Sequence, residues 1–246
     1  MRPRSSYVVV GILGLLIAGG MVVSGKDPAA PERRRSLIAA DDIPQWATAS
    51  VLTLTEQGVI REDIGRFRPG DPLLLEELYV FVYRDLLSHG FVLPIVLDGC
   101  RVEGVPAGSE LALAVCTFRR QEWLPRRGDL EDLSGQVTRA EMAQFLHTVF
   151  GPSIEGGQSL TADGFLKRGS LFTDVPVMHP NFLAVHVLHD VGVMEAPKGG
   201  PFGVDASINR AATALVLDRM NRLLEKLRID TLKTHNSADA GRMKAL

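Results

Sequence analysis

Three stretches of this chain follow one pattern, and that repetition limits the fold more than any other feature. Val137–Leu146 reads VTRAEMAQFL, and Ile208–Leu217, 71 positions later, reads INRAATALVL. An earlier stretch, Phe67–Leu86, places a similar apolar segment after FRPGDP. Each repeat of this kind is one supersecondary unit that buries its apolar face only against its neighbours. We therefore expect one domain made of three related units.

Each unit predicts the same pair of helices. A hydrophobic-Pro step, Ile43-Pro44 in the first copy and Val175-Pro176 in the third, precedes a first amphipathic helix. A Gly-Val pair ends that helix in the outer copies, as glycine commonly does at helix C-termini. A loop with Phe67 or Phe202 then leads to the second helix. We expect the units at about 37–90, 101–151 and 171–227, inside a domain spanning 37–229, with a polar flexible tail at 230–246.

The second helix of each unit is the clearer one. Apolar residues recur with the spacing i, i+3, i+4 and i+7, which is typical of a helix with one buried face. In the middle copy this stripe consists of Met142, Phe145, Leu146, Val149 and Phe150. Thr138 with Glu141 forms a capping box at the helix start, and Asn209 is a favoured cap residue in the last copy. The sequence therefore predicts a mainly α fold of packed helix pairs.

The middle unit departs from this pattern. Ser109–Trp123 can form its first helix, but the preceding PIVLDGCRVEGV, residues 94–105, is typical of short strands. We expect a small β insertion there. Both cysteines of the chain, Cys100 and Cys116, lie in this region. They are candidates for a disulfide if the domain is exported, because oxidising compartments preserve disulfides, and buried free thiols are the alternative.

The amino terminus carries an uncharged apolar segment. Two arginines precede a run of 17 residues, 7–23, which as a helix would span about 25 Å and can cross a thin bilayer. Residues 1–25 are therefore interpreted as a transmembrane anchor or as a secretory signal, which has a similar layout. An internal apolar helix is the third alternative. A linker rich in proline and arginine, 26–36, follows this segment.

The composition and the motifs argue against several classes of function. The chain has 246 residues, 27 of them basic and 29 acidic, and this formal charge of −2 argues against a dedicated nucleic-acid-binding protein. No glycine-rich phosphate loop, nucleophile–base pair or paired carboxylates stand out, so we expect no enzyme and no cofactor. His179, His186 and His189, with Asp190, form the one metal-like group. His186 and His189 lie opposite the apolar stripe of their predicted helix, so we expect a solvated face or a face between units there rather than a metal site.

Several features of the repeats together resemble S-layer homology domains. The strongest is Val137-Thr138-Arg139-Ala140-Glu141, which is close to the family's Ile-Thr-Arg-Ala-Glu. Phe172-Thr173-Asp174-Val175 stands at the start of a unit, and Trp46-Ala47 lies in a first helix. The Gly-Val turn and FRPGDP before a second helix complete the set. The resemblance covers about Leu37–Glu225. It implies a pseudo-threefold bundle of helix pairs, with acidic, often pyruvylated, cell-wall polysaccharide held in the grooves between units.

The resemblance also implies which residues face the ligand. Arg139 and Arg210 stand at the starts of second helices. There a planar guanidinium combines with exposed amides and the positive end of the helix dipole, which suits a carboxylate. The remaining members of the candidate ligand-binding set are Trp46, Thr138, Glu141 and Asn209. The first unit has Leu75 in place of the arginine, and the last has Ala212 in place of the motif glutamate. The alternatives are structural arginines that pair with a neighbouring carboxylate or carbonyl, and a Trp46 that packs at the rim of the core.

Two functions follow from this interpretation. The first is a non-enzymatic, membrane-tethered module that binds an anionic cell-envelope glycopolymer, with residues 7–23 in the lipid bilayer and the bulk of the chain extracytoplasmic, in the periplasm. The alternative is an accessory or scaffold subunit of a larger membrane protein complex, which docks through protein–protein contacts on the same side of the membrane. Both predict a binding protein rather than a catalyst.

Overall fold

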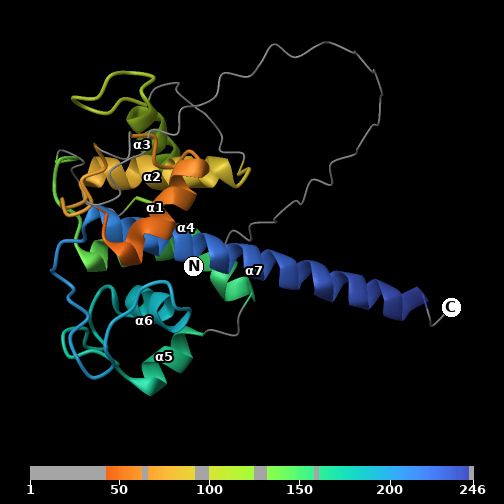
Figure 1. The fold of residues 1–246 in the computed structure, drawn as a ribbon. Coiled ribbons are helices and arrows are strands. Elements are labelled where there is room, and N and C mark those ends of the chain that lie inside the picture. Colours follow the sequence, from red (N-terminus) through yellow and green to blue (C-terminus); the bar gives the residue numbers. More distant parts are fainter. Residues whose placement is uncertain (1–42, 63–65, 92–99, 125–131, 158–160, 244–246) are drawn as a thin grey trace, which may run out of the picture. The chain divides into compact units, whose positions relative to one another are not determined.

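The computed structural model describes residues 43–62, 66–91, 100–124, 132–157 and 161–243, with side chains up to residue 228 (Figure 1). These residues form seven helices and no strand beyond isolated single-residue bridges, so the prediction of a mainly α fold is confirmed. The predicted membrane segment, 7–23, and the linker, 26–36, lie outside the described residues. Among the helices of the described part, none is long and apolar enough to span a bilayer.

Each predicted unit contributes a first and a second helix. They are α1 (Gln45–Glu56) and α2 (Leu75–Ser88) in the first unit, α3 (Glu110–Arg120) and α4 (Arg139–Gly157) in the second, and α6 (Phe182–Asp190) and α7 (Arg210–Met243) in the third, with the short α5 (Ala162–Arg168) between α4 and α6. The first helices pack in a circular order: α1 on α7, α3 on α2 and α6 on α4. Each first helix therefore lies on the second helix of the preceding unit, and α1 closes the circle.

Backbone hydrogen bonds join the segments that precede the second helices into a closed ring. The N–H of Leu73 donates to the carbonyl of Ile208 (2.8 Å), that of Ile208 to Val137 (2.9 Å), and that of Val137 to Leu73 (2.9 Å). Residues just before a helix have amides and carbonyls that the helix itself cannot satisfy, so they need partners elsewhere. The ring supplies them and brings the N-termini of α2, α4 and α7 together.

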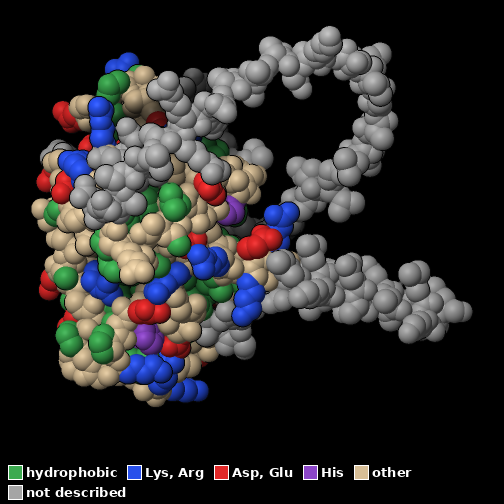
Figure 2. All heavy atoms as spheres, in the orientation of Figure 1, with side chains coloured by type: hydrophobic (Ala, Val, Ile, Leu, Met, Phe, Trp, Pro, Cys, Tyr) green, Lys and Arg blue, Asp and Glu red, His purple; other side chains and the backbone are tan. Residues whose placement is uncertain are grey.

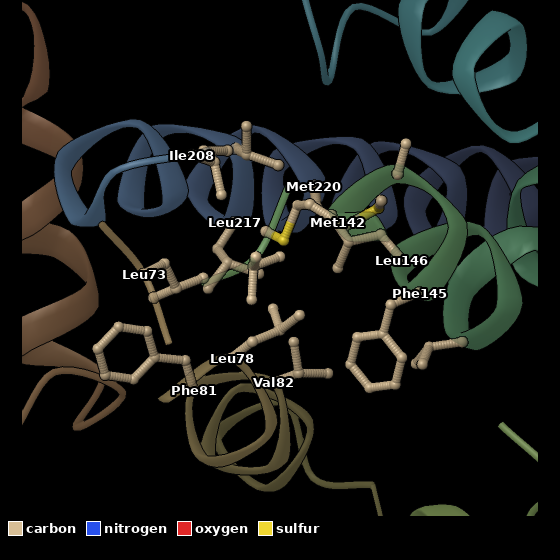
Figure 3. Packing of buried hydrophobic residues seen from close by; sticks show 14 of the residues in the cluster. Leu73, Leu78, Phe81, Val82, Met142, Phe145, Leu146, Ile208, Leu217 and Met220 are labelled. Carbon is tan, nitrogen blue, oxygen red and sulfur yellow. The ribbon is translucent and has the colours of Figure 1, made fainter. Parts of the chain in front are cut away.

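The core fills the space between the second helices. Figure 3 shows apolar side chains from α2, α4 and α7 pointing toward one another; they include Leu78, Val82, Met142, Leu146, Leu217 and Met220. All six of these side chains are buried. The helical spacing of apolar residues in each copy therefore serves one shared core, which no single unit could form alone.

Two segments differ in the described part of the chain from what the sequence predicts. The sequence predicts strands over 94–105, but residues 100–105 contain a turn and no strand, and 94–99 lie outside the described residues. The predicted tail at 230–246 is helical as far as Met243, where α7 ends (Figure 1). No glycine or proline occurs between Val204 and Ala240, so nothing in that stretch stops the helix.

Candidate functional site

Arg139 stands at the first position of α4, within the capping box that Thr138 and Glu141 form. Glu141 Oε2 accepts hydrogen bonds from the backbone N–H and the hydroxyl of Thr138 (both 3.0 Å), and Thr138 Oγ1 accepts one from the N–H of Glu141 (3.2 Å). These contacts satisfy amides of the first turn and fix the start of the helix. Thr138 and Glu141, both predicted as ligand-binding residues, therefore position Arg139.

The guanidinium of Arg139 reaches across to the third unit. Its Nε donates to the carbonyl of Phe202 and its Nη2 to the carbonyl of Glu195, both at 2.9 Å. Its Cζ lies 4.6 Å from the centroid of the Phe202 ring. Partial burial lowers the pKa of Arg139, although the nearby carboxylate of Asp174 acts in the opposite direction. Two carbonyl groups and a ring thus hold the guanidinium in a fixed place, with the Asp174 carboxylate nearby but outside ion-pair distance.

Asp174 shapes the loop on which Arg139 rests. Its carboxylate accepts hydrogen bonds from the N–H groups of Phe202 (2.7 Å), Gly203 (2.7 Å) and Val204 (3.1 Å). Desolvation acts to raise the pKa of Asp174, but these three bonds outweigh it and hold the pKa below its ordinary value. Gly203 has φ +81°, a left-handed conformation that glycine adopts without strain. The Asp174 contacts therefore present the Phe202 carbonyl and ring to Arg139.

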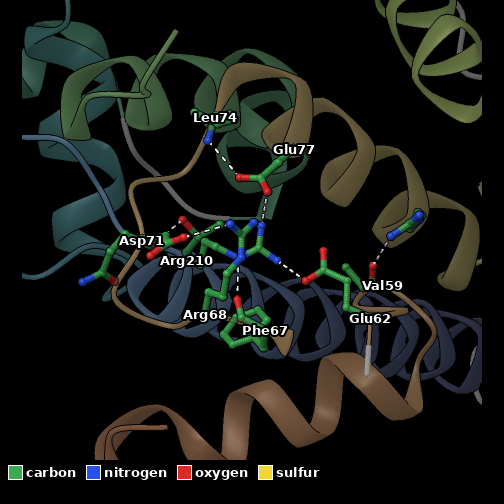
Figure 4. A network of polar contacts seen from close by, with 11 residues as sticks. Val59, Glu62, Phe67, Arg68, Asp71, Leu74, Glu77 and Arg210 are labelled. Carbon is green, nitrogen blue, oxygen red and sulfur yellow. Dashed lines mark hydrogen bonds and ion pairs between the residues drawn. The ribbon is translucent and has the colours of Figure 1, made fainter. Parts of the chain in front are cut away.

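Arg210 repeats this arrangement between the third and first units (Figure 4). Its Nε donates to the carbonyl of Phe67 (2.7 Å), and its Cζ lies 5.0 Å from the centroid of the Phe67 ring. Two carboxylates complete the site: Nη2 pairs with Glu62 (2.5 Å) and Nη1 pairs with Glu77. The Arg210 side chain has 0% exposed surface. In this structure the chain itself surrounds and neutralises the cation, which is the arrangement expected of the alternative, a structural arginine paired with neighbouring carboxylates.

The difference between the two sites corresponds to two alanines. Counted from the Gly-Val pair that follows the first helix, Glu62 corresponds to Ala196; counted from the start of the second helix, Glu77 corresponds to Ala212. Among the described residues, no carboxylate forms an ion pair with Arg139. The half-buried Arg139 thus lacks the counter-ions that its counterpart has, and an external carboxylate could supply one.

The third matching position carries no cation. Leu75 makes the same backbone contact as the two arginines, since its N–H donates to the carbonyl of Gly135 (2.9 Å), but its side chain packs against the core. The departure noted in the sequence therefore removes one of three equivalent places for a bound anion. What remains is one sealed site, one apolar site and one site whose arginine has no ion pair among the described residues.

The last two predicted ligand residues lie elsewhere. Asn209 Oδ1 accepts a hydrogen bond from the N–H of Ala212 (2.8 Å), so Asn209 caps α7. Trp46 is 53% exposed near the start of α1, which leaves its ring available to a partner.

On the face drawn in Figure 2, hydrophobic side chains are scattered among interspersed basic and acidic ones.

The two cysteines are bonded to each other, and His186 is hydrogen-bonded inside the fold. Cys100 and Cys116 form a disulfide with a Cα–Cα distance of 5.9 Å. The predicted solvated face at His186 is wrong: this side chain is fully buried, its Nε2 accepts from the N–H of Leu171 (3.0 Å), and Nδ1 lies 2.7 Å from the carbonyl of Phe182. Burial also lowers the pKa of His186, which favours the neutral ring. The described residues contain no group of three potential metal ligands.

Comparison with known proteins adds no further constraint. No protein-family model matches the chain, and no curated protein matches it. The geometry at Arg139 therefore carries the functional interpretation. The residues that sequence reasoning did not select are Phe202, Asp174 and Glu195 around Arg139, and Glu62 and Glu77 around Arg210. A signal existed for the two Phe residues, which recur at matching places in the loops, and for Asp174, which belongs to the motif at the start of the third unit.

Proposed function

We propose that this protein is a non-enzymatic binding module of the S-layer homology type, whose three units form a pseudo-threefold bundle. On this proposal it holds a carboxylate of an anionic cell-envelope glycopolymer at Arg139. The observation that carries the proposal is a half-buried guanidinium that neutral groups hold in place while both matching carboxylate positions are alanine. A planar carboxylate is the natural counter-ion for the N–H groups that remain.

Two further observations support the bundle arrangement. The closed ring of hydrogen bonds through Leu73, Val137 and Ile208 links three equivalent positions in cyclic order. The circular packing of α1, α3 and α6 on the second helices follows the same order. Both are what three copies of one unit produce when each contacts the next around a common axis.

The disulfide supports an extracytoplasmic location. Disulfides persist in oxidising compartments and are rare in the cytosol of most organisms. Cys100 and Cys116 tie α3 to the segment before it, so their bond belongs to the folded middle unit. We therefore propose that the domain works outside the cytoplasm, anchored through the apolar segment 7–23.

Sedimentation with purified sacculi tests the proposal. The full chain, in mild detergent, should pellet with sacculi that retain their polymers and should stay in solution once the polymers are stripped. Arg139→Ala should weaken the binding about 10- to 100-fold, since it removes a charge-assisted hydrogen-bonding group. Ala212→Glu should weaken it similarly, because it supplies the internal carboxylate that Arg210 already has.

The matched control for this assay is Arg120→Ala. Arg120 is an exposed arginine at the end of α3, so its loss changes the net charge by the same amount without touching the site. Binding equal to that of the wild type is expected for this variant. Unchanged binding by Arg139→Ala would refute a role for Arg139, and no binding by the wild-type protein would refute the polymer as ligand.

The second candidate function is a subunit of a membrane protein complex. Exposed apolar side chains favour it, above all Met178, 91% exposed, and Trp46. This candidate would be supported over the first if membrane proteins co-purified with the full chain and the chain had no affinity for sacculi. The co-purification should then be lost on Trp46→Ala or Met178→Ser.

A further inference from the structure

The Arg210 site contains the same neutral frame as the Arg139 site. In each, a guanidinium bonds a Phe carbonyl and stacks on the ring of that same residue, Phe67 or Phe202. A second ring, Phe81, lies 5.5 Å from Arg210. The frame therefore orients the guanidinium without any carboxylate, and the carboxylates at Arg210 occupy the place where an anion would bind.

The two carboxylates at Arg210 differ in what else holds them. Glu77 caps the start of α2, since its Oε2 also accepts the N–H of Leu74 (3.0 Å), and its side chain is 19% exposed. Glu62 follows α1, and Arg210 is its only ion-pair or hydrogen-bond partner among the described residues. Its side chain is 39% exposed, so one edge of the ion pair faces solvent. Glu77 is part of the scaffold, whereas Glu62 occupies a position at the surface.

We infer that Glu62 is a built-in ligand, a carboxylate of the chain itself that closes a second anion site at Arg210. Each protein molecule then offers one open site, at Arg139, and one site that becomes available only when Glu62 leaves. The ligand class that fits the second site is a carboxylate, because Glu62 itself is one and the guanidinium presents a planar donor edge to it. This inference rests on the proposed function for its biological meaning, but its test does not.

Chemical rescue of Glu62→Ala tests the inference. Removing one member of a buried ion pair typically costs several kcal/mol, so the melting temperature of the full chain should fall by about 10 °C. Sodium acetate should restore most of this loss in a saturable manner, and sodium chloride at the same ionic strength should not. The wild type should show only the small shift that acetate gives any protein by exclusion from its surface.

Two further variants make the result specific. Glu56→Ala removes another exposed glutamate, at the end of α1, and should respond to acetate as the wild type does. Glu62→Gln keeps an oxygen acceptor at the same place and should be destabilised less and rescued little. If Glu62→Ala does not fold in chloride, refolding in acetate alone supports the inference, and failure to fold in both salts overturns it. An acetate response no larger than that of Glu56→Ala also overturns it.

The two proposals can fail separately. Acetate rescue of Glu62→Ala should persist when Arg139→Ala is added, since the two guanidiniums lie in different inter-unit contacts. Rescue without any binding to sacculi would leave Glu62 as a built-in ligand while refuting the polymer-binding function. Binding to sacculi without rescue would retain the function at Arg139 and refute the closed second site.

Discussion

Arg139 and Arg210 occupy matching positions in consecutive units, yet their electrostatic surroundings are opposite. Both begin a second helix, bond a Phe carbonyl and stack on a Phe ring. Arg210 is then buried between Glu62 and Glu77, whereas Arg139 is half-buried and, within the described part of the chain, donates its side-chain hydrogen bonds to carbonyl groups. The repeated scaffold therefore sets where an arginine lies, and residues of the adjacent unit decide whether it becomes an internal ion pair or an unneutralised cation.

The largest expected effect is on stability at Arg210. Arg210→Met should lower the free energy of unfolding by about 3 to 5 kcal/mol, because it leaves Glu77 without its cation and empties a buried position. Arg139→Met should cost about 1 kcal/mol, since solvent already reaches that side chain. Urea unfolding followed by circular dichroism measures both values. Equal losses for the two variants would contradict the distinction between a sealed and an open site.

A second comparison is between two carboxyl groups, those of Glu77 and Asp85. Glu77 pairs with the guanidinium of Arg210, whereas Asp85 is buried with no guanidinium partner among the described residues. Burial raises its pKa from 3.8 to about 6, although a hydrogen bond from Asn221 and the proximity of His89 act to lower it. Because the folded pKa lies above the unfolded one, the proton stabilises the folded state below about pH 4, and this stabilisation is lost as the pH rises through 6. The loss should amount to about 2 to 3 kcal/mol.

Unfolding measured between pH 4 and 7 tests this expectation. Asp85→Asn should remove most of the slope, because the amide keeps the shape of the side chain and does not titrate. His89→Gln serves as the control, since His89 Nδ1 lies 3.9 Å from the Asp85 carboxylate and the substitution leaves Asp85 itself in place. A slope that follows His89→Gln instead of Asp85→Asn would assign the pH dependence to the histidine.

The loops that carry the two Phe residues allow a finer comparison. Gly203→Ala should cost about 1 kcal/mol, because φ +81° strains any residue with a Cβ. It should also weaken ligand binding at Arg139, which rests on the adjacent carbonyl. Gly70→Ala, in the corresponding loop of the first unit, meets no atom within 4 Å and has no positive φ, so it should be neutral. Thermal unfolding and sacculus sedimentation of both variants check this contrast.

The smallest expected effect on stability comes from giving Arg139 a carboxylate at the position where Arg210 has Glu77. Ala212→Glu should raise the free energy of unfolding by less than about 1 kcal/mol, because the new ion pair with Arg139 is only partly buried. The gain should shrink in high salt and should vanish when Arg139→Met is added, which a double-mutant cycle measures. An equal gain in the Arg139→Met background would place the new carboxylate away from the guanidinium.

The prediction of the fold from the sequence succeeded where the signal is local. The helix starts at Thr138 and Asn209 and the apolar stripe from Met142 to Phe150 depend on neighbours within a few residues, and the structure contains them. Residues 100–105, the described part of the strands expected before α3, form no strand, because strand-forming composition is not enough without a partner strand. His186 was misplaced because its buried polar atoms are satisfied by Leu171, outside its own helix.

The sequence itself determines the repeat, the mainly α fold and the two candidate arginines, because each depends on spacing within one unit. Which arginine is sealed was decided only by the tertiary structure. Glu62 and Glu77 lie more than a hundred positions before Arg210 in the chain, and the circular packing of the units brings them to it. Burial and charge pairing depend on groups that meet in space, so the same helix start holds a neutralised cation in one unit and an unneutralised one in another.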